Sequence, residues 1–237
     1  MRYALITGAS SDIGISTVRA YLDSGWGVYA HYRTPRPELL HLRDGGAPVI
    51  PFSLDFSDAA VVERELAMGP DWALKADALV TLAADARPTR FETFAAAELA
   101  QVLATNVIST LLVTRVCAQA MADRGWGRIV HGSSIGVKFG GGADSFAYSL
   151  SKHALEFQPE AYRRLAAAGV LVNVVRIGVT DTRIHQHFPG KDMAARAAKV
   201  PMGRLATPDE IAQSIHWLGS ELNTFTCNQI ISVSGGE

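Results

Sequence analysis

Seven short apolar runs alternate with segments of helical pattern along the chain, and this alternation limits the possible folds more than any other feature. Strands that are apolar on both faces and separated by helices pair in parallel and are covered by helices on both sides. We therefore predict an α/β, doubly wound domain with a central parallel sheet of about seven strands. The runs cover residues 2–7, 27–32, 48–53, 77–83, 128–132, 171–177 and 229–233. The helical patterns cover 13–24, 36–43, 58–67, 92–123, the segment from Tyr148 to about 168, and 208–219.

Two prolines fall inside these predicted elements. Pro51 lies within the third apolar run, and a proline is tolerated there only if the strand is at an edge of the sheet. Pro159 lies within the helix that follows Tyr148. At that position it removes one hydrogen bond, and we expect a kink that costs about 3 kcal/mol.

Composition excludes several classes of protein. Hydrophobic residues make up 48% of the chain and charged residues 19%, which is enough to bury a large core. The net charge of −1 gives no basic field for nucleic acid or an anionic membrane surface. The first residues reach glycine and serine too soon for a signal peptide, and the most apolar long segment, 99–117, carries Gln101, Asn106 and Arg115. We therefore expect a cytoplasmic protein without a membrane span.

Tyr148 and Lys152 lie four residues apart in a segment of helical pattern, directly after a glycine-rich loop. This spacing places both side chains on one face of a helix, about 6 Å apart along its axis. An adjacent ammonium stabilises phenolate, so we expect the pKa of Tyr148 to fall below its ordinary value of about 10. A serine of the preceding loop, Ser134 or Ser133, could hold a carbonyl oxygen beside the phenol. Taken alone, such a pair is more often a packed ring and a solvated charge.

The segment Thr7–Gly14 joins the first strand to the first helix and consists mostly of small residues. Small residues let the backbone approach a pyrophosphate, and the N-terminus of a helix favours negative charge. Many such turns need glycine only for its backbone conformation. The place of this turn at the end of the first strand favours a dinucleotide site. The Asp12 carboxylate would repel phosphates unless it points away, and we expect it to be the N-cap of the helix.

These features together resemble the classical short-chain dehydrogenase/reductase family over residues 2–236. The resemblance includes the glycine turn, Asp55–Phe56 after the third strand, the Tyr148–Lys152 spacing and the closing pattern RLATPDEIA…SVSGG. It implies a single NAD(P)-binding domain of the Rossmann type over 1–237, with a substrate lid at about 180–200. It also implies hydride transfer between a nicotinamide and a carbonyl or alcohol.

The resemblance assigns catalytic roles to four residues. Tyr148 is the general acid and base, and Lys152 lowers its pKa and binds the nicotinamide ribose. Ser134 positions the substrate oxygen; it is preferred to Ser133 because its distance from Tyr148 is nearer to that usual in the family. Asn106 links Lys152 to solvent through a water molecule. Without the resemblance, Asn106 is a polar group in a helix that is satisfied locally.

The residues expected to bind the dinucleotide lie at the carboxyl ends of the predicted strands. The second strand ends in Tyr32 and Arg33, without the acid that binds a ribose 2′-hydroxyl. Because arginine suits a 2′-phosphate, NADP(H) is favoured over NAD(H), although Arg33 could also be a solvated surface residue. The family's Asn-Asn-Ala-Gly motif is Thr81–Ala84 here, so the asparagine that braces the sheet is missing. The expected cofactor-binding residues are Gly8, Ser10, Ser11, Asp12, Ile13, Gly14, Arg33, Asp55, Phe56, Ala83, Tyr148, Lys152, Gly178, Thr180 and Thr182.

The resemblance further implies a small-molecule carbonyl or alcohol substrate and a homo-oligomer, either a dimer or a tetramer. His185, His187, Phe188 and Lys191 could line the mouth of the site. Two histidines at i and i+2 do not share a helix face, so no metal site is expected. Two alternatives stay open. One is a protein that binds the cofactor or a partner without turnover, and the other is a dehydratase or epimerase with no net redox change.

Overall fold

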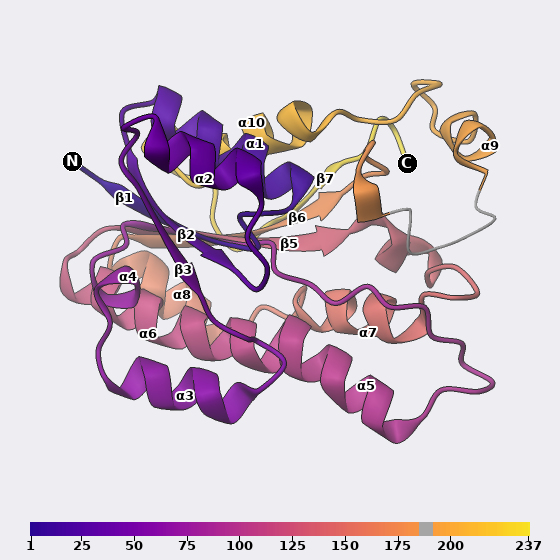
Figure 1. Cartoon of the computed structure of the whole chain (residues 1–237), viewed down its shortest axis with the longest axis horizontal. Coiled ribbons are helices and arrows are strands. Elements are labelled where there is room, and N and C mark those ends of the chain that lie inside the picture. The colour runs from indigo at the N-terminus through magenta and orange to yellow at the C-terminus, as the bar shows by residue number, and fades with distance from the viewer. Residues whose placement is uncertain (185–191) are drawn as a thin grey trace.

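A seven-stranded parallel sheet forms the centre of the molecule, with helices on both faces (Figure 1). The computed structural model describes residues 1–184 and 192–237. The strand order is β3-β2-β1-β4-β5-β6-β7, and every neighbouring pair is parallel. This confirms the predicted doubly wound α/β fold. The strands are β1 (Tyr3–Thr7), β2 (Gly27–Tyr32), β3 (Val49–Ser53), β4 (Ala78–Thr81), β5 (Gly127–Ser134), β6 (Val170–Ile177) and β7 (Ile230–Val233).

The helices form two layers around this sheet (Figure 1). One layer contains α1 (Asp12–Asp23), α2 (Pro37–Asp44) and α10 (Pro208–Leu218). The other contains α3 (Ala59–Ala67), α4 (Asp71–Leu74), α5 (Ala96–Leu103), α6 (Ser109–Asp123), α7 (Phe146–Ala154) and α8 (Glu160–Ala167). Successive strand residues point to opposite faces. Leu5 and Leu79 therefore join the core under α6, whereas Ile6 and Val80 join the core under α1 and α10.

Several elements differ from the sequence-based expectations. β5 extends through Ser134, so both candidate serines belong to a strand and not to the loop. The short helix α4 was not predicted. Part of the segment 180–200, expected to be a substrate lid, forms the helix α9 (Met193–Ala197). β3 pairs only with β2 and is an edge strand, which accommodates Pro51 as predicted.

Pro159 separates two helices and does not kink one. α7 ends at Ala154, and Pro159 is the N-cap of α8, with φ −65° and ψ 154°. A residue at this position donates no hydrogen bond within the helix, so the missing N–H of proline costs nothing there. The prediction of one kinked helix to about residue 168 was wrong for this reason.

Helices α5 and α6 form one continuous stretch, Ala96–Asp123, joined by a π-helical turn, η1 (Ala104–Ile108). In the described part of the chain it is the one helix whose length and composition would allow it to cross a membrane. Val113, Cys117 and Met121 recur along one of its faces and are fully buried against the sheet. The stretch therefore packs as a core helix of the domain.

A buried hydrogen-bonded group braces the centre of the sheet. Thr81 of β4 and His131 of β5 are paired across the two strands, and the Thr81 hydroxyl lies 3.0 Å from His131 Nδ1. The Tyr162 hydroxyl of α8 lies 3.3 Å from His131 Nε2. The asparagine brace that Thr81–Ala84 lacks is thus replaced by a threonine, a histidine and a tyrosine.

A second buried histidine ties the glycine turn to β3. His31 Nδ1 accepts from the Gly8 amide at 3.3 Å, and His31 Nε2 lies 2.8 Å from the Leu54 carbonyl oxygen. Its ring stacks on Phe56, with centroids 4.2 Å apart. Burial lowers the pKa of both His31 and His131 to about 4, and the Lys152 ammonium adds to the shift at His131. Both rings are therefore neutral at physiological pH.

We expect the free energy of unfolding to fall between pH 7 and pH 5. The pKa of His31 and His131 is about 4 in the folded protein, against an ordinary value of 6.5. The unfolded chain therefore binds protons that the folded chain excludes, and the stability present above pH 6.5 is lost as the pH falls toward 4. Between pH 7 and pH 5 each of the two histidines should lower the free energy of unfolding by about 2 kcal/mol, which urea denaturation measures.

The substitution His131→Gln should remove about 2 kcal/mol of this pH-dependent loss, because the contribution of that ring is gone. His41→Gln is the matched control, since His41 is exposed on α2, and it should leave the loss unchanged. An equal loss in His131→Gln and the unmodified protein would contradict the assignment.

Candidate cofactor and catalytic site

The candidate site lies where the chain reverses its direction of winding through the sheet. The chain winds outward from β1 to β3 on one side, and then from β4 to β7 on the other. In doubly wound folds the crevice beyond the carboxyl ends of the strands at this switch point binds ligands. The turn after β1 and the loop after β4 meet at this position.

The glycine turn after β1 leaves no room for side chains at two positions. Gly8 has φ +69°, and a Cβ atom there would lie 2.7 Å from the Ala83 amide nitrogen. A Cβ atom on Gly14 would lie 2.3 Å from the Gly8 carbonyl oxygen. The Ser11 hydroxyl accepts from the Gly14 amide at 3.0 Å and donates to the Gly8 carbonyl at 2.8 Å. The turn is therefore a compact cradle that fits a pyrophosphate at the start of α1.

Ser11, and not Asp12, is the N-cap of α1. The prediction for Asp12 was wrong because the Ser11 hydroxyl already binds the amide that a cap must satisfy. The Asp12 carboxylate instead accepts from Arg36 Nη1 at 2.9 Å and from Arg183 Nη2 at 2.6 Å. Ser10 and Ile13, the other expected turn residues, are partly exposed beside it.

Thr7 fixes the turn to the end of β4. Its hydroxyl accepts from the amides of Leu82 and Ala83, each at 3.2 Å. Ala83, which was expected to contact the cofactor, is thereby placed directly beside Gly8. The strands β1 and β4 stay joined beyond their last paired residues.

The residues expected on the adenosine side divide into exposed and buried ones. Arg33 is exposed after β2. Asp55 is also exposed, and its bond from the Ser57 amide at 2.9 Å lowers its pKa, with Arg33 contributing. Phe56 is 3% exposed, and its ring packs on His31. The Phe56 side chain is therefore a core residue, whereas Arg33 and Asp55 face solvent.

Ser134, Tyr148 and Lys152 converge at the carboxyl end of β5. The Ser134 hydroxyl accepts from the Gly136 amide at 3.2 Å and lies close enough to the Tyr148 phenol to lower its pKa. The Lys152 ammonium donates to the Gly132 carbonyl at 2.7 Å and lies 5.7 Å from the centroid of the Tyr148 ring. One strand and one helix thus supply all three side chains.

Burial dominates the titration of this pair. Removal from water raises the pKa of Tyr148 to about 12, although the hydrogen bond with Ser134 lowers it in part. Burial lowers the pKa of Lys152 to about 8. The expected downward shift at Tyr148 was wrong, because the cost of burying a phenolate outweighs the neighbouring ammonium. At neutral pH the phenol is protonated and Lys152 is mostly charged.

Ser133 faces the opposite side of β5 from Ser134. Its hydroxyl donates to Glu156 Oε1 at 2.8 Å and to the Lys152 carbonyl at 3.2 Å. Glu156 in turn accepts two hydrogen bonds from Arg176, at 2.8 and 2.7 Å. This group fixes the end of α7 against β5 and β6, so the sequence-based preference for Ser134 agrees with the positions of the two hydroxyls.

Asn106 lies in the π turn between α5 and α6 and is fully buried. Its Oδ1 accepts from the Asp85 amide at 2.6 Å, and its Nδ2 donates to the Asp85 carbonyl at 3.0 Å. Nδ2 also lies 2.8 Å from the hydroxyl of Ser151, the residue before Lys152. Asn106 therefore has local partners, as the simpler interpretation requires, and also reaches the Tyr148 helix.

The residues expected on the nicotinamide side follow β6. A Cβ atom on Gly178 would lie 2.6 Å from the Ser234 Cα atom, so only glycine fits. Thr180 is buried and donates to the Gly178 carbonyl at 2.9 Å, and Thr182 donates to the Thr180 carbonyl at 3.4 Å. The expected mouth residues His185, His187, Phe188 and Lys191 lie outside the described residues.

Sequence reasoning missed the partners of two acidic residues. Arg36 and Arg183 contact Asp12, and Arg176 contacts Glu156. One signal was available for the first pair, because a carboxylate at an expected anion site requires a compensating cation. Nothing in the spacing indicated which arginines would supply it.

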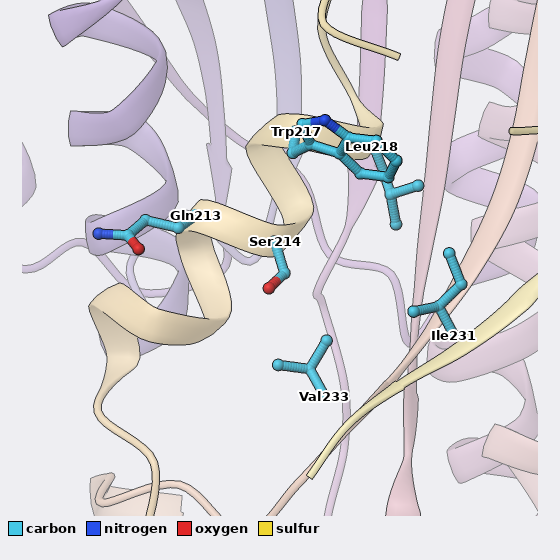
Figure 2. Close-up of a pocket in the computed structure, with 6 residues that line it drawn as sticks. All are labelled: Gln213, Ser214, Trp217, Leu218, Ile231 and Val233. Carbon is cyan, nitrogen blue, oxygen red and sulfur yellow. The ribbon is translucent and has the colours of Figure 1, made fainter. Parts of the chain in front are cut away.

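A separate apolar hollow lies between α10 and β7, and none of the expected site residues lines it (Figure 2). Trp217 and Leu218 point into it from α10, and Ile231 and Val233 from β7. β7 is an edge strand of the sheet. The hollow is therefore a feature of the outer surface and not of the crevice.

Comparisons with known proteins are consistent with this geometry. A family model described as enoyl-(acyl carrier protein) reductase matches residues 8–237. Nodulation protein G of Azospirillum brasilense is 32% identical, covering 99% of this chain and 97% of that protein. Acetoacetyl-CoA reductase of Rhizobium meliloti (strain 1021) is 30% identical, covering 100% and 98%. The crystal structure of a variant actinorhodin polyketide ketoreductase with NADPH is 28% identical with a TM-score of 0.85, covering 99% and 96%.

The close approach at Gly8 can be tested against a glycine without neighbours. Gly8→Ala and Gly46→Ala both place alanine at positive φ, which costs about 1 kcal/mol. A Cβ atom meets nothing within 4 Å at Gly46 but meets the Ala83 backbone at Gly8. Gly8→Ala should therefore lower the free energy of unfolding by about 2 kcal/mol more than Gly46→Ala in urea denaturation. Equal losses would show that the approach of β1 to the Ala83 loop is not tight.

Proposed function

Because the chain belongs to the classical short-chain dehydrogenase/reductase family and is an oxidoreductase, we propose that it interconverts a ketone or aldehyde and an alcohol. The observation that carries the proposal is the convergence of Ser134, Tyr148 and Lys152 beside a glycine cradle at the switch point. A protein that only binds a nucleotide has no need of this convergence. The bound nicotinamide dinucleotide supplies or accepts the hydride at the carbonyl carbon.

The cradle of Gly8 and Gly14 binds the pyrophosphate, because glycine at both positions lets the turn close tightly at the start of α1. Lys152 binds the nicotinamide ribose, and the segment from Gly178 to Thr182 binds the carboxamide end. Arg33 favours NADP(H) over NAD(H), because it is exposed where a 2′-phosphate is bound in such folds. The NADPH in the related ketoreductase supports this preference.

Tyr148 donates the proton to the carbonyl oxygen during reduction and accepts it during oxidation. A pKa near 12 keeps the phenol protonated at neutral pH, as a proton donor requires. The Ser134 hydroxyl positions the substrate oxygen beside it, and the Lys152 charge stabilises the phenolate that forms. Asn106, placed beside Ser151, connects this group to solvent.

A 3-ketoacyl thioester is the first substrate class to test. The related proteins named acetoacetyl-CoA reductase and actinorhodin polyketide ketoreductase, and the acyl-carrier-protein reductase family model, support this class. Turnover without net consumption of NADPH would instead favour a dehydratase or epimerase.

We further propose that the protein is a cytoplasmic homo-oligomer. Two surfaces carry exposed apolar side chains that a second copy could cover. The first adjoins the hollow of Figure 2, and the second lies along α6 and α7. The first includes Trp217, Leu222, Phe225 and Ile230, and the second includes Ile108, Leu111, Leu150 and Phe157.

Tyr148→Phe should reduce turnover of a ketoacyl thioester by at least about 1000-fold, because it removes the proton donor. It should leave the Kd for NADPH within a few-fold, since little packing is lost. Tyr3→Phe is the matched control, because Tyr3 packs against Tyr29 at the opposite end of β1, and it should keep normal turnover. Near-normal rates in Tyr148→Phe would overturn the assigned role.

Lys152→Met should weaken NADPH binding as well as turnover, because one ammonium serves both the ribose and the phenol. Fluorescence titration measures the first effect and steady-state kinetics the second. An unchanged Kd would remove the ribose contact from the mechanism while leaving the role of Tyr148 intact.

The cofactor preference predicts that NADPH binds more tightly than NADH in a fluorescence titration. Arg33→Gln should raise the Kd for NADPH about tenfold and leave that for NADH within about twofold, because only NADPH carries the 2′-phosphate. Similar changes for both nucleotides would show that Arg33 does not select between them. Binding of neither nucleotide to the unmodified protein would favour the alternative without turnover.

A further inference from the structure

Asp12 occupies a position where the family usually has glycine, and its carboxylate is the centre of a charged group. Two guanidinium groups meet at one of its oxygens, Oδ1. Arg36 Nη1 lies 2.9 Å from this oxygen, and Arg183 Nε and Nη2 lie 2.9 and 2.6 Å from it. The second oxygen, Oδ2, accepts from the Arg183 amide at 2.8 Å. The carboxylate is partly buried, with 19% of the side chain exposed.

The two arginines bind Asp12 in different ways. Arg183 makes three of the four hydrogen bonds, including both from its guanidinium, and so neutralises the carboxylate by itself. Arg36 makes one bond, and among residues 1–184 and 192–237 no second acceptor lies within hydrogen-bond distance of its guanidinium. Glu38 lies 3.9 Å from Arg183 and is half-exposed, so it offsets little of the remaining charge. One positive charge, on Arg36, is left for another anion.

Arg36 lies between the two places where a dinucleotide carries phosphate. Its partner Asp12 is the first residue of α1, where the helix N-terminus and the glycine cradle favour a pyrophosphate. Arg36 itself directly precedes α2, a few residues after the end of β2, where the adenosine ribose lies in such folds. A planar guanidinium with unused donors suits either phosphate.

We propose that Asp12 is a positioning residue that holds Arg36 at the mouth of the glycine cradle as a phosphate contact for the dinucleotide. Arg183 neutralises the carboxylate, so that Asp12 does not repel the phosphate it helps to bind. The proposal rests on the function proposed above. The phosphate is either the 2′-phosphate of NADPH or the pyrophosphate that NADPH and NADH share.

The test is a fluorescence titration of the full-length protein and its variants with NADPH and with NADH. Arg36→Gln should raise the Kd for NADPH at least tenfold. A change for NADPH alone identifies the 2′-phosphate, and a similar change for both nucleotides identifies the pyrophosphate. Arg43→Gln is the matched control, because it removes the same charge from an exposed residue of α2 whose ion-pair partner among the described residues is its neighbour Asp44. It should change neither Kd by more than twofold.

Asp12→Asn separates positioning from simple repulsion. If Asp12 only repels phosphate, its neutralisation should tighten NADPH binding. If Asp12 positions Arg36, the variant should bind NADPH about three- to tenfold more weakly, with an unchanged thermal melting temperature in the absence of nucleotide. If Asp12→Asn binds NADPH more weakly but also has a lower melting temperature, its effect could come from lost stability. Arg36→Gln then tests the proposal, because it removes the phosphate contact itself.

Three results would overturn the proposal, and they separate its failure from failure of the proposed function. Tight NADPH binding by the unmodified protein with no effect of Arg36→Gln, or tighter binding by Asp12→Asn, would reject the role of Asp12 and leave the proposed function standing. Failure of the unmodified protein to bind either nucleotide would reject the proposed function and this inference with it.

Discussion

The seam between β1 and β4 is the contact on which the crevice depends. The Thr7 hydroxyl accepts two amides from the loop after β4, and Gly8 approaches that loop so closely that a single added carbon would meet its backbone. This seam fixes the glycine turn at the switch point. There the connections that follow β1 and β4 lead to opposite sides of the sheet. Without this seam, the start of α1 and the end of β5 would not border one crevice.

Two buried histidines next to this seam form hydrogen bonds that link the strands of the sheet to each other and to the glycine turn. His31 joins the Gly8 amide to the end of β3, and His131 joins β4, β5 and α8. Both rings are neutral because water is excluded around them, and each has polar partners at both nitrogens. A buried polar group is tolerated in a core only when such partners exist. Thr81, His131 and Tyr162 meet this requirement at the centre of the sheet.

Charge in the crevice follows the same rule of compensation. Asp12 stands where an anion is expected to bind, and its carboxylate is neutralised by Arg183 and also contacts Arg36. Glu156 lies just after α7 and is neutralised by Arg176. Tyr148 and Lys152 have no such opposite charge among the residues that the structure describes, and burial shifts the pKa of each in the direction that favours its neutral form. Such a pair suits the proton transfer that we propose, whereas the acidic residues beside it are held in ion pairs.

The sequence by itself determined the fold class, the order of the elements and the segments that carry the site. Hydrophobic periodicity and glycine positions are local properties, and the spacing of Tyr148 and Lys152 already places both on one helix face. The tertiary structure decided what depends on distant partners. Ser11, and not Asp12, is the N-cap of α1, and Pro159 is the N-cap of a separate helix. Burial raises the pKa of Tyr148. Desolvation and ion pairing depend on which residues meet in space, and a pattern along the chain does not contain that information.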